Sequence, residues 1–154
     1  ALNCRSKLWP PAEACQTFES LFSAVDILVA AERDVRTVLG RTGDATALAS
    51  GLMADFDFET VVITRGDDGA LALHDGTIDE QPAFDTETVD AIGTGDAFVG
   101  AYLARYVAGD SVTDALSYAA ATAALKRTIS GDLAVVTPDE VEQVLEQTES
   151  GISR

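Results

Sequence analysis

The stretch "TVDAIGTGDAFVGAYLARYV", residues 88–107, joins a glycine-rich turn to an apolar helical pattern. Gly93 and Gly95 flank Thr94, and Asp96 follows directly, so the turn lies at the start of the expected helix. The first N–H groups of a helix have no internal partner and carry partial positive charge, which attracts anions. Because glycine also permits the close approach that a Cβ atom would obstruct, the stretch predicts a turn whose amides converge on a phosphate.

The carboxylate of Asp96 lies beside this expected anion site. It would serve as a general base if an acceptor hydroxyl came within hydrogen-bond reach. The alternative is a capping role, because aspartate is common at helix starts and Gly-x-Gly occurs in many loops. On these four residues alone, capping is the simpler interpretation.

Other phosphate and metal motifs are excluded by inspection. The dinucleotide fingerprint G-x-G-x-x-G would need glycine where Phe98 stands, and neither lysine follows a glycine as a P-loop requires. The single histidine, His74, is expected in a solvated hairpin turn. With Cys4 and Cys15 it offers no zinc or Ser-His-Asp site, so no metal-ligating residue is assigned.

The rest of the chain indicates an α/β fold. Continuous apolar runs predict buried strands at 25–30 and 60–64, and Asp75-Gly76 is a favoured type I′ pair between two further strands. Helices are expected at 12–24, 32–40, 45–56, 95–108, 113–127 and 138–148. Strands that alternate with helices predict a mainly parallel sheet with one hairpin.

The charge limits the possible partners. The chain has 26 acidic and 10 basic residues, a net charge of −16, which disfavours binding to nucleic-acid phosphates. Acidic residues scattered along the whole chain are typical of proteins from salt-loving organisms. No apolar run is long enough for a membrane span and the start has no signal-peptide core, so we expect a cytoplasmic protein without a membrane partner.

Two motifs resemble the PfkB (ribokinase-like) family of carbohydrate kinases. "VDAIGTGDAF" is similar to the family signature Asp-Thr-x-Gly-Ala-Gly-Asp, with Thr94 where alanine is usual and Ala91 where threonine is usual. The matching positions are Asp90, Gly93, Gly95 and Asp96. "VVITRGDDGALAL" resembles the family's Val-Thr-x-Gly-x-x-Gly strand–turn–strand. The resemblance implies a ribokinase-like three-layer α/β/α sandwich, of which residues 1–154 are the C-terminal, nucleotide-binding part, without the N-terminal sugar-binding and lid half.

The opening segment narrows the expected substrate. "LNCRSKLWPPAEA" resembles the Asn-x-Arg-x-x-Leu-Trp stretch of 2-keto-3-deoxygluconate kinases, which implies a nucleotide contact for Asn3 and a sugar-acid contact for Arg5. Arginine offers a planar fork to a carboxylate, although Arg5 could equally pair with an acidic neighbour. Asp132 matches a position that contacts the sugar acid, and its alternative role is that of a turn aspartate.

The resemblance implies direct transfer of a phosphoryl group from ATP to the sugar acid. Asp96 would take the proton of the primary hydroxyl, and the amides of residues 93–96 would stabilise the transferring group. Mg²⁺ would be held through ATP and water. The other residues assigned to the nucleotide are Thr64, Arg65, Gly66, Asp67, Asp68 and Gly69.

Two alternatives stay open. One is a non-catalytic nucleotide-binding or interaction module, and the other is a PfkB-type kinase that acts on fructose, ribose or a nucleoside. Without the sugar-binding half, we expect the 154 residues alone to be inactive, because positioning supplies much of the rate. An exposed sheet edge and apolar faces also predict a homo-oligomer.

Overall fold

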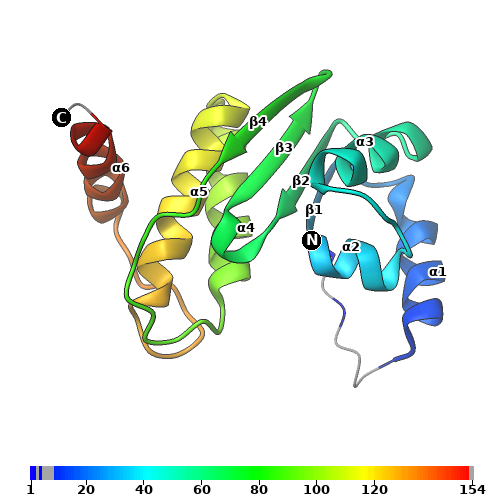
Figure 1. Cartoon of the computed structure of the whole chain (residues 1–154), viewed down its shortest axis with the longest axis horizontal. Coiled ribbons are helices and arrows are strands. Elements are labelled where there is room, and N and C mark those ends of the chain that lie inside the picture. Colours follow the sequence, from blue (N-terminus) through cyan, green and yellow to red (C-terminus); the bar gives the residue numbers. More distant parts are fainter. Residues whose placement is uncertain (3, 5–8, 153–154) are drawn as a thin grey trace. The chain divides into compact units, whose positions relative to one another are not determined.

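A computed structural model describes residues 1–2, 4 and 9–152 of the chain (Figure 1). The chain divides into two compact units, Ala1–Glu80 and Gln81–Arg154. Asn3 and Arg5 lie outside the described residues, so their expected contacts with the nucleotide and the sugar acid stay predictions.

The first unit is built on a four-stranded sheet. Its strands are β1 (Ile27–Ala31), β2 (Thr60–Thr64), β3 (Ala70–His74) and β4 (Thr77–Gln81), in the order β1-β2-β3-β4. β1 is parallel to β2, with Ile27 opposite Thr60, whereas β2 is antiparallel to β3. The sheet is therefore mixed, and the expectation of a mainly parallel sheet is wrong for the described strands. The links after β2 and β3 are too short for the crossover that a parallel pair needs.

The predicted hairpin between β3 and β4 is confirmed. Asp75 and Gly76 have φ angles of 47° and 74°, and a type I′ turn requires positive values at both positions. His74 is not the solvated turn residue that was expected. It ends β3 opposite Thr60, and its Nδ1 lies 2.8 Å from the Thr60 hydroxyl, so the antiparallel register half-buries the ring.

Three helices accompany this sheet, and all three were predicted within a few residues. They are α1 (Pro11–Phe22), α2 (Glu32–Val38) and α3 (Ala45–Asp55). The Asp44 carboxylate caps α3 by accepting a 2.8 Å hydrogen bond from the amide of Ala47. Aliphatic side chains of these helices pack on β1, β2 and β3. Val61, Val62 and Ile63 are completely buried, so both faces of β2 are covered. The apolar run 60–64 predicted a strand of this kind.

The second unit consists of three helices and the segments that join them. These are α4 (Thr94–Ala108), α5 (Val112–Arg127) and α6 (Pro138–Ile152), and α4 packs along α5 in Figure 1. Buried alanines of α5, such as Ala119, let the two helices approach closely. Thr137 and Glu140 form a capping box at the start of α6, in which the Thr137 amide donates to Glu140 Oε2 at 2.7 Å. None of the helices in the described part of the chain has the length and apolarity that a membrane span needs.

Candidate functional site

The glycine-rich turn leads directly into α4. Gly93 is the N-cap residue, with a φ of 79° and no side-chain cap. The amide of Thr94 donates to the Ala91 carbonyl at 3.3 Å, and the amide of Ala97 donates to the Gly93 carbonyl at 2.9 Å. Since a helix provides no internal acceptor for its first amides, those of Gly95 and Asp96 face the open end of α4. This end of the helix has the donors that an anion needs.

Gly93 lies where no larger residue fits. A Cβ atom at this position would meet the backbone oxygen of Asp132 at 2.0 Å. The glycine therefore meets two requirements at once, a left-handed φ and the close approach of a second backbone segment. The structure thus brings together the turn before α4 and the turn that contains Asp132. The Asp132 side chain is exposed, and its expected contact with a sugar acid stays a prediction.

The Asp90 carboxylate links the same two segments. Its Oδ1 accepts a hydrogen bond from the Ile92 amide at 2.9 Å, and its Oδ2 accepts one from the Gly131 amide at 3.0 Å. These two bonds hold the pKa of the Asp90 carboxyl below its ordinary value of 3.8, and the Lys126 ammonium acts in the same direction. Asp90 is therefore a structural anion that ties the turn to the segment beyond α5.

Asp96 stands in the first turn of α4 with an exposed side chain. A Cβ atom added at the neighbouring Gly95 would meet nothing within 4 Å, so the space beside that glycine is open. The acid is therefore accessible to a hydroxyl group and lies next to amides that can bind a phosphate. This arrangement is compatible with a general base, and the carboxylate also complements the helix dipole.

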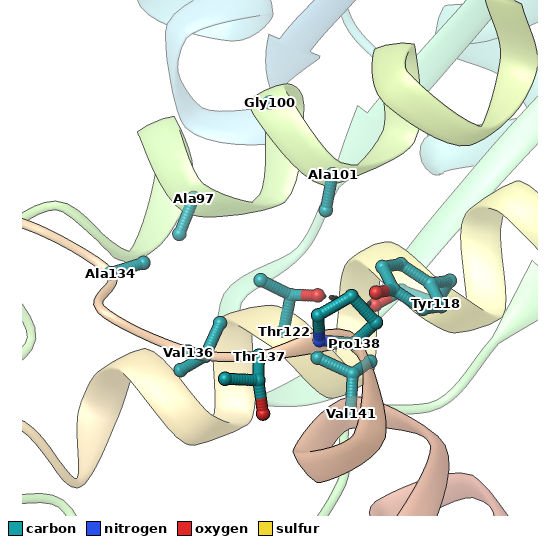
Figure 2. A pocket seen from close by; sticks show the side chains of 10 residues that line it. All are labelled: Ala97, Gly100, Ala101, Tyr118, Thr122, Ala134, Val136, Thr137, Pro138 and Val141. Carbon is teal, nitrogen blue, oxygen red and sulfur yellow. Dashed lines mark hydrogen bonds between the residues drawn. The ribbon is translucent and has the colours of Figure 1, made fainter. Parts of the chain in front are cut away.

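A pocket of about 350 Å³ lies in the second unit, between α4, α5 and the segment that leads into α6 (Figure 2). Small residues of α4 form one wall and Tyr118 and Thr122 of α5 another, with the Thr122 hydroxyl donating to the Tyr118 carbonyl at 2.9 Å. The lining residues are Ala97, Gly100, Ala101, Tyr118, Thr122, Ala134, Val136, Thr137, Pro138 and Val141. This pocket was not predicted from the sequence. A signal was present, because Ala97, Gly100 and Ala101 leave one face of α4 without large side chains.

The second predicted nucleotide motif, residues 64–69, lies in the first unit between β2 and β3. The 3₁₀-helix η1 (Gly66–Asp68) forms the turn, and the Arg65 amide donates to the Gly69 carbonyl at 2.7 Å. The Arg65 guanidinium is already paired, because its Nη1 lies 3.0 Å from Glu80 Oε2. Asp67 and Asp68 are exposed. A nucleotide role for these residues stays a prediction.

Comparison with known proteins is consistent with this geometry. A family model described as "pfkB family carbohydrate kinase" matches residues 1–139. The chain is 68% identical to a 2-dehydro-3-deoxygalactonokinase of Haloferax volcanii, over 99% of this chain and 48% of that protein. A relative from Haloferax fits the salt-adapted character predicted from the charge.

Solved structures show the same architecture. The 2-dehydro-3-deoxygluconokinase of Thermotoga maritima matches with a TM-score of 0.85 and 28% identity, over 94% of this chain and 48% of that one. A fructokinase of Vibrio cholerae, solved in a form with fructose, ADP and calcium ion bound, matches with a TM-score of 0.81 and 25% identity, over 92% and 48%. The expected ribokinase-like α/β fold is confirmed. The chain spans about half the length of these relatives.

Proposed function

Since the chain belongs to the pfkB family of carbohydrate kinases, we propose that its residues form the nucleotide-binding part of a kinase that transfers a phosphoryl group from ATP to a sugar acid. The observation that carries the proposal is the open amide end of α4 beside the exposed Asp96 carboxylate. Phosphate binding alone would not need a carboxylate at this position. Relatives named for 2-dehydro-3-deoxy sugar acids support that substrate class, and the 68% identical one favours the galactonate epimer over the gluconate.

The proposed reaction is an in-line displacement. The Asp96 carboxylate accepts the proton of the primary hydroxyl while the hydroxyl oxygen bonds to the γ-phosphorus. The bond from that phosphorus to the bridging oxygen breaks, and ADP leaves with the electron pair. The amides of Gly93, Thr94, Gly95 and Asp96 donate to the negative charge on the transferring group. Mg²⁺, when bound, would neutralise part of that charge, and we assign no side chain of this chain to the metal.

We place the base of the nucleotide in the pocket beside α4. A volume of about 350 Å³ with mostly apolar walls suits an aromatic base, and Ala97 follows directly after Asp96 in the helix. A second proposed nucleotide contact, with residues 64–69, rests on its motif alone. The protein is further proposed to form homo-oligomers, which light scattering in high salt would test.

The test compares Asp96→Asn with wild type in the whole encoded protein, by an ADP-release assay. Substrates are 2-keto-3-deoxygalactonate, 2-keto-3-deoxygluconate, fructose and ribose. Loss of the base should lower kcat by about 10²–10⁴-fold, while ATP affinity changes by less than about threefold. Asp139→Asn, in the first turn of α6, is the matched control because it removes an acid from another helix start and should leave turnover unchanged.

Two outcomes would contradict the proposal. Retained turnover in Asp96→Asn would leave that acid with its capping role only. A wild-type protein that binds ATP and phosphorylates none of the four sugars would favour the non-catalytic module.

A further inference from the structure

Lys126, in the last turn of α5, is completely buried. Lysine is rarely buried unless its charge is paired, because removing an ammonium from water is costly. The Nζ of Lys126 donates to the Ile129 carbonyl at 3.0 Å and to the Asp90 carbonyl at 3.4 Å. Both of these acceptors are backbone groups of the two segments that meet at Gly93. The phosphoryl transfer described above makes no use of this charge, so its burial needs a separate reason.

Other bonds hold the same segment to the end of α5. The amides of Val89 and Asp90 both donate to the Arg127 carbonyl, at 2.8 and 3.0 Å, and Arg127 Nε donates to the Thr88 hydroxyl at 2.9 Å. Residues 88–90 are thus bonded to the last turn of the helix. The Lys126 ammonium adds a bond to the segment that follows α5, because its Nζ donates to the Ile129 carbonyl.

We propose that Lys126 is a positioning residue for the phosphate-binding turn, an inference that rests on the proposed kinase function. Its ammonium holds the carbonyls of Asp90 and Ile129 together, which fixes the separation of the backbones that meet where Gly93 contacts Asp132. In this way the amides at the start of α4 are held in position before a phosphate arrives.

The test removes the ammonium group and keeps an unbranched side chain that is one atom shorter. Lys126→Met in the whole encoded protein should lower kcat by about 10–100-fold, since small displacements of catalytic groups have effects of this size. KM for the sugar acid should change by less than about threefold, because Lys126 is not a substrate contact. Thr60→Val is the control for lost stability, because it removes a buried hydroxyl–His74 bond in the first unit and should leave kcat unchanged.

Chemical rescue separates positioning from general packing. The rescue experiment replaces tetramethylammonium chloride with ammonium chloride at constant concentration. The kcat of Lys126→Met should then rise at least about tenfold, because an ammonium ion can bind the same two carbonyls. Wild type and Thr60→Val should not respond. A Lys126→Met variant with wild-type kcat, or one with low kcat that ammonium does not raise, would overturn the inference.

Two further measurements keep the inference testable. If Lys126→Met does not fold, two other variants replace it: Lys126→Arg keeps the charge, and Lys126→Gln keeps only a neutral donor. The Arg variant should retain a higher kcat than the Gln variant. The reverse order would overturn the proposal. Backbone hydrogen exchange of residues 88–93 is independent of activity. It should accelerate at least about tenfold in the variant without a charge, and unchanged exchange would refute a positioning role. If wild type is inactive on every sugar while this exchange effect is present, the kinase proposal fails and the role in the turn stands.

Discussion

Two glycine-rich turns were predicted to contact the same nucleotide, yet they are built in different ways. The turn of residues 66–69 is closed on itself, because the Gly69 amide donates to the Gly66 carbonyl at 3.1 Å and the Gly69 carbonyl accepts from the Arg65 amide. A Cβ atom added to Gly66 would meet nothing within 4 Å. Gly66 is therefore needed only for its φ of 65°. The turn therefore satisfies its own backbone and leaves few donors for a ligand.

The turn of residues 93–96 depends on a distant segment instead. Gly93 is in contact with the Asp132 backbone, and the Asp90 carboxylate accepts from Gly131. The amides of Gly95 and Asp96 lie in the first turn of a 15-residue helix, which offers them no internal acceptor. The two turns are both rich in glycine, yet one is held by its own backbone and the other by the segment of residues 131–132.

The largest effect is expected for Gly93→Ala. The added Cβ clashes with the Asp132 carbonyl, and alanine must also adopt a left-handed φ. The free energy of unfolding should therefore fall by about 2–5 kcal/mol. Activity measured below the unfolding temperature should also be lost, since the amides at the helix start are displaced. Urea unfolding of the whole protein gives the first quantity and ADP release the second. A variant as stable as wild type would contradict the tight contact.

Gly66→Ala is the matched substitution in the other turn. Here alanine meets the left-handed φ but no clash, so the free energy of unfolding should fall by only about 1–2 kcal/mol. The same urea experiment measures it. The comparison between the two turns would fail if Gly66→Ala were as damaging to stability as Gly93→Ala.

A smaller effect is expected from the charge of Asp90. Because the pKa of this carboxyl is lower in the folded protein than its ordinary value of 3.8, its stabilisation is complete well above that value and is lost as the pH falls below it. Asp90→Asn should therefore be less stable than wild type near neutral pH, and the difference should shrink toward pH 3. Urea unfolding at a series of pH values gives both curves, and a difference independent of pH would show that the carboxylate does not hold the turn.

The smallest effect on stability is expected for Gly95→Ala. This position has no steric obstacle and lies in the first turn of α4, where alanine is favoured over glycine by about 0.5–1 kcal/mol. The melting temperature should rise slightly while ATP affinity and kcat fall, because the new methyl group would lie in the proposed phosphate site. A more stable variant with full activity would remove Gly95 from the proposed site.

Much of the fold follows from local sequence patterns. Strand 60–64 and the Asp75-Gly76 hairpin were predicted as they stand, and helix bounds differed by a few residues except at the end of α6. The mixed sheet was missed, since apolar runs indicate buried strands but do not give their direction. The half-buried His74 was missed for a related reason, because its partner Thr60 is brought opposite only by strand pairing.

The candidate site was predicted in part. The motif identified Gly93, Gly95 and Asp96, and the structure supplies the reason for the first of them through its contact with Asp132. The pocket beside α4 and the buried Lys126 were not predicted. The pocket depends on how α4 packs along α5, and the contacts of Lys126 depend on where the chain brings Asp90. A lysine next to Arg127 at a helix end looks in the sequence like an ordinary exposed residue.

The sequence by itself determined the order of helices and strands, the hairpin and the motif that marks the family. These depend on residues close together in the chain, where side-chain periodicity and the φ angles open to glycine act directly. Only the tertiary structure decided that Lys126 reaches Asp90, 36 residues away, and that Gly93 meets Asp132. Such contacts depend on the packing of whole helices, so the bonds that hold the turn in place appear only once the chain is folded.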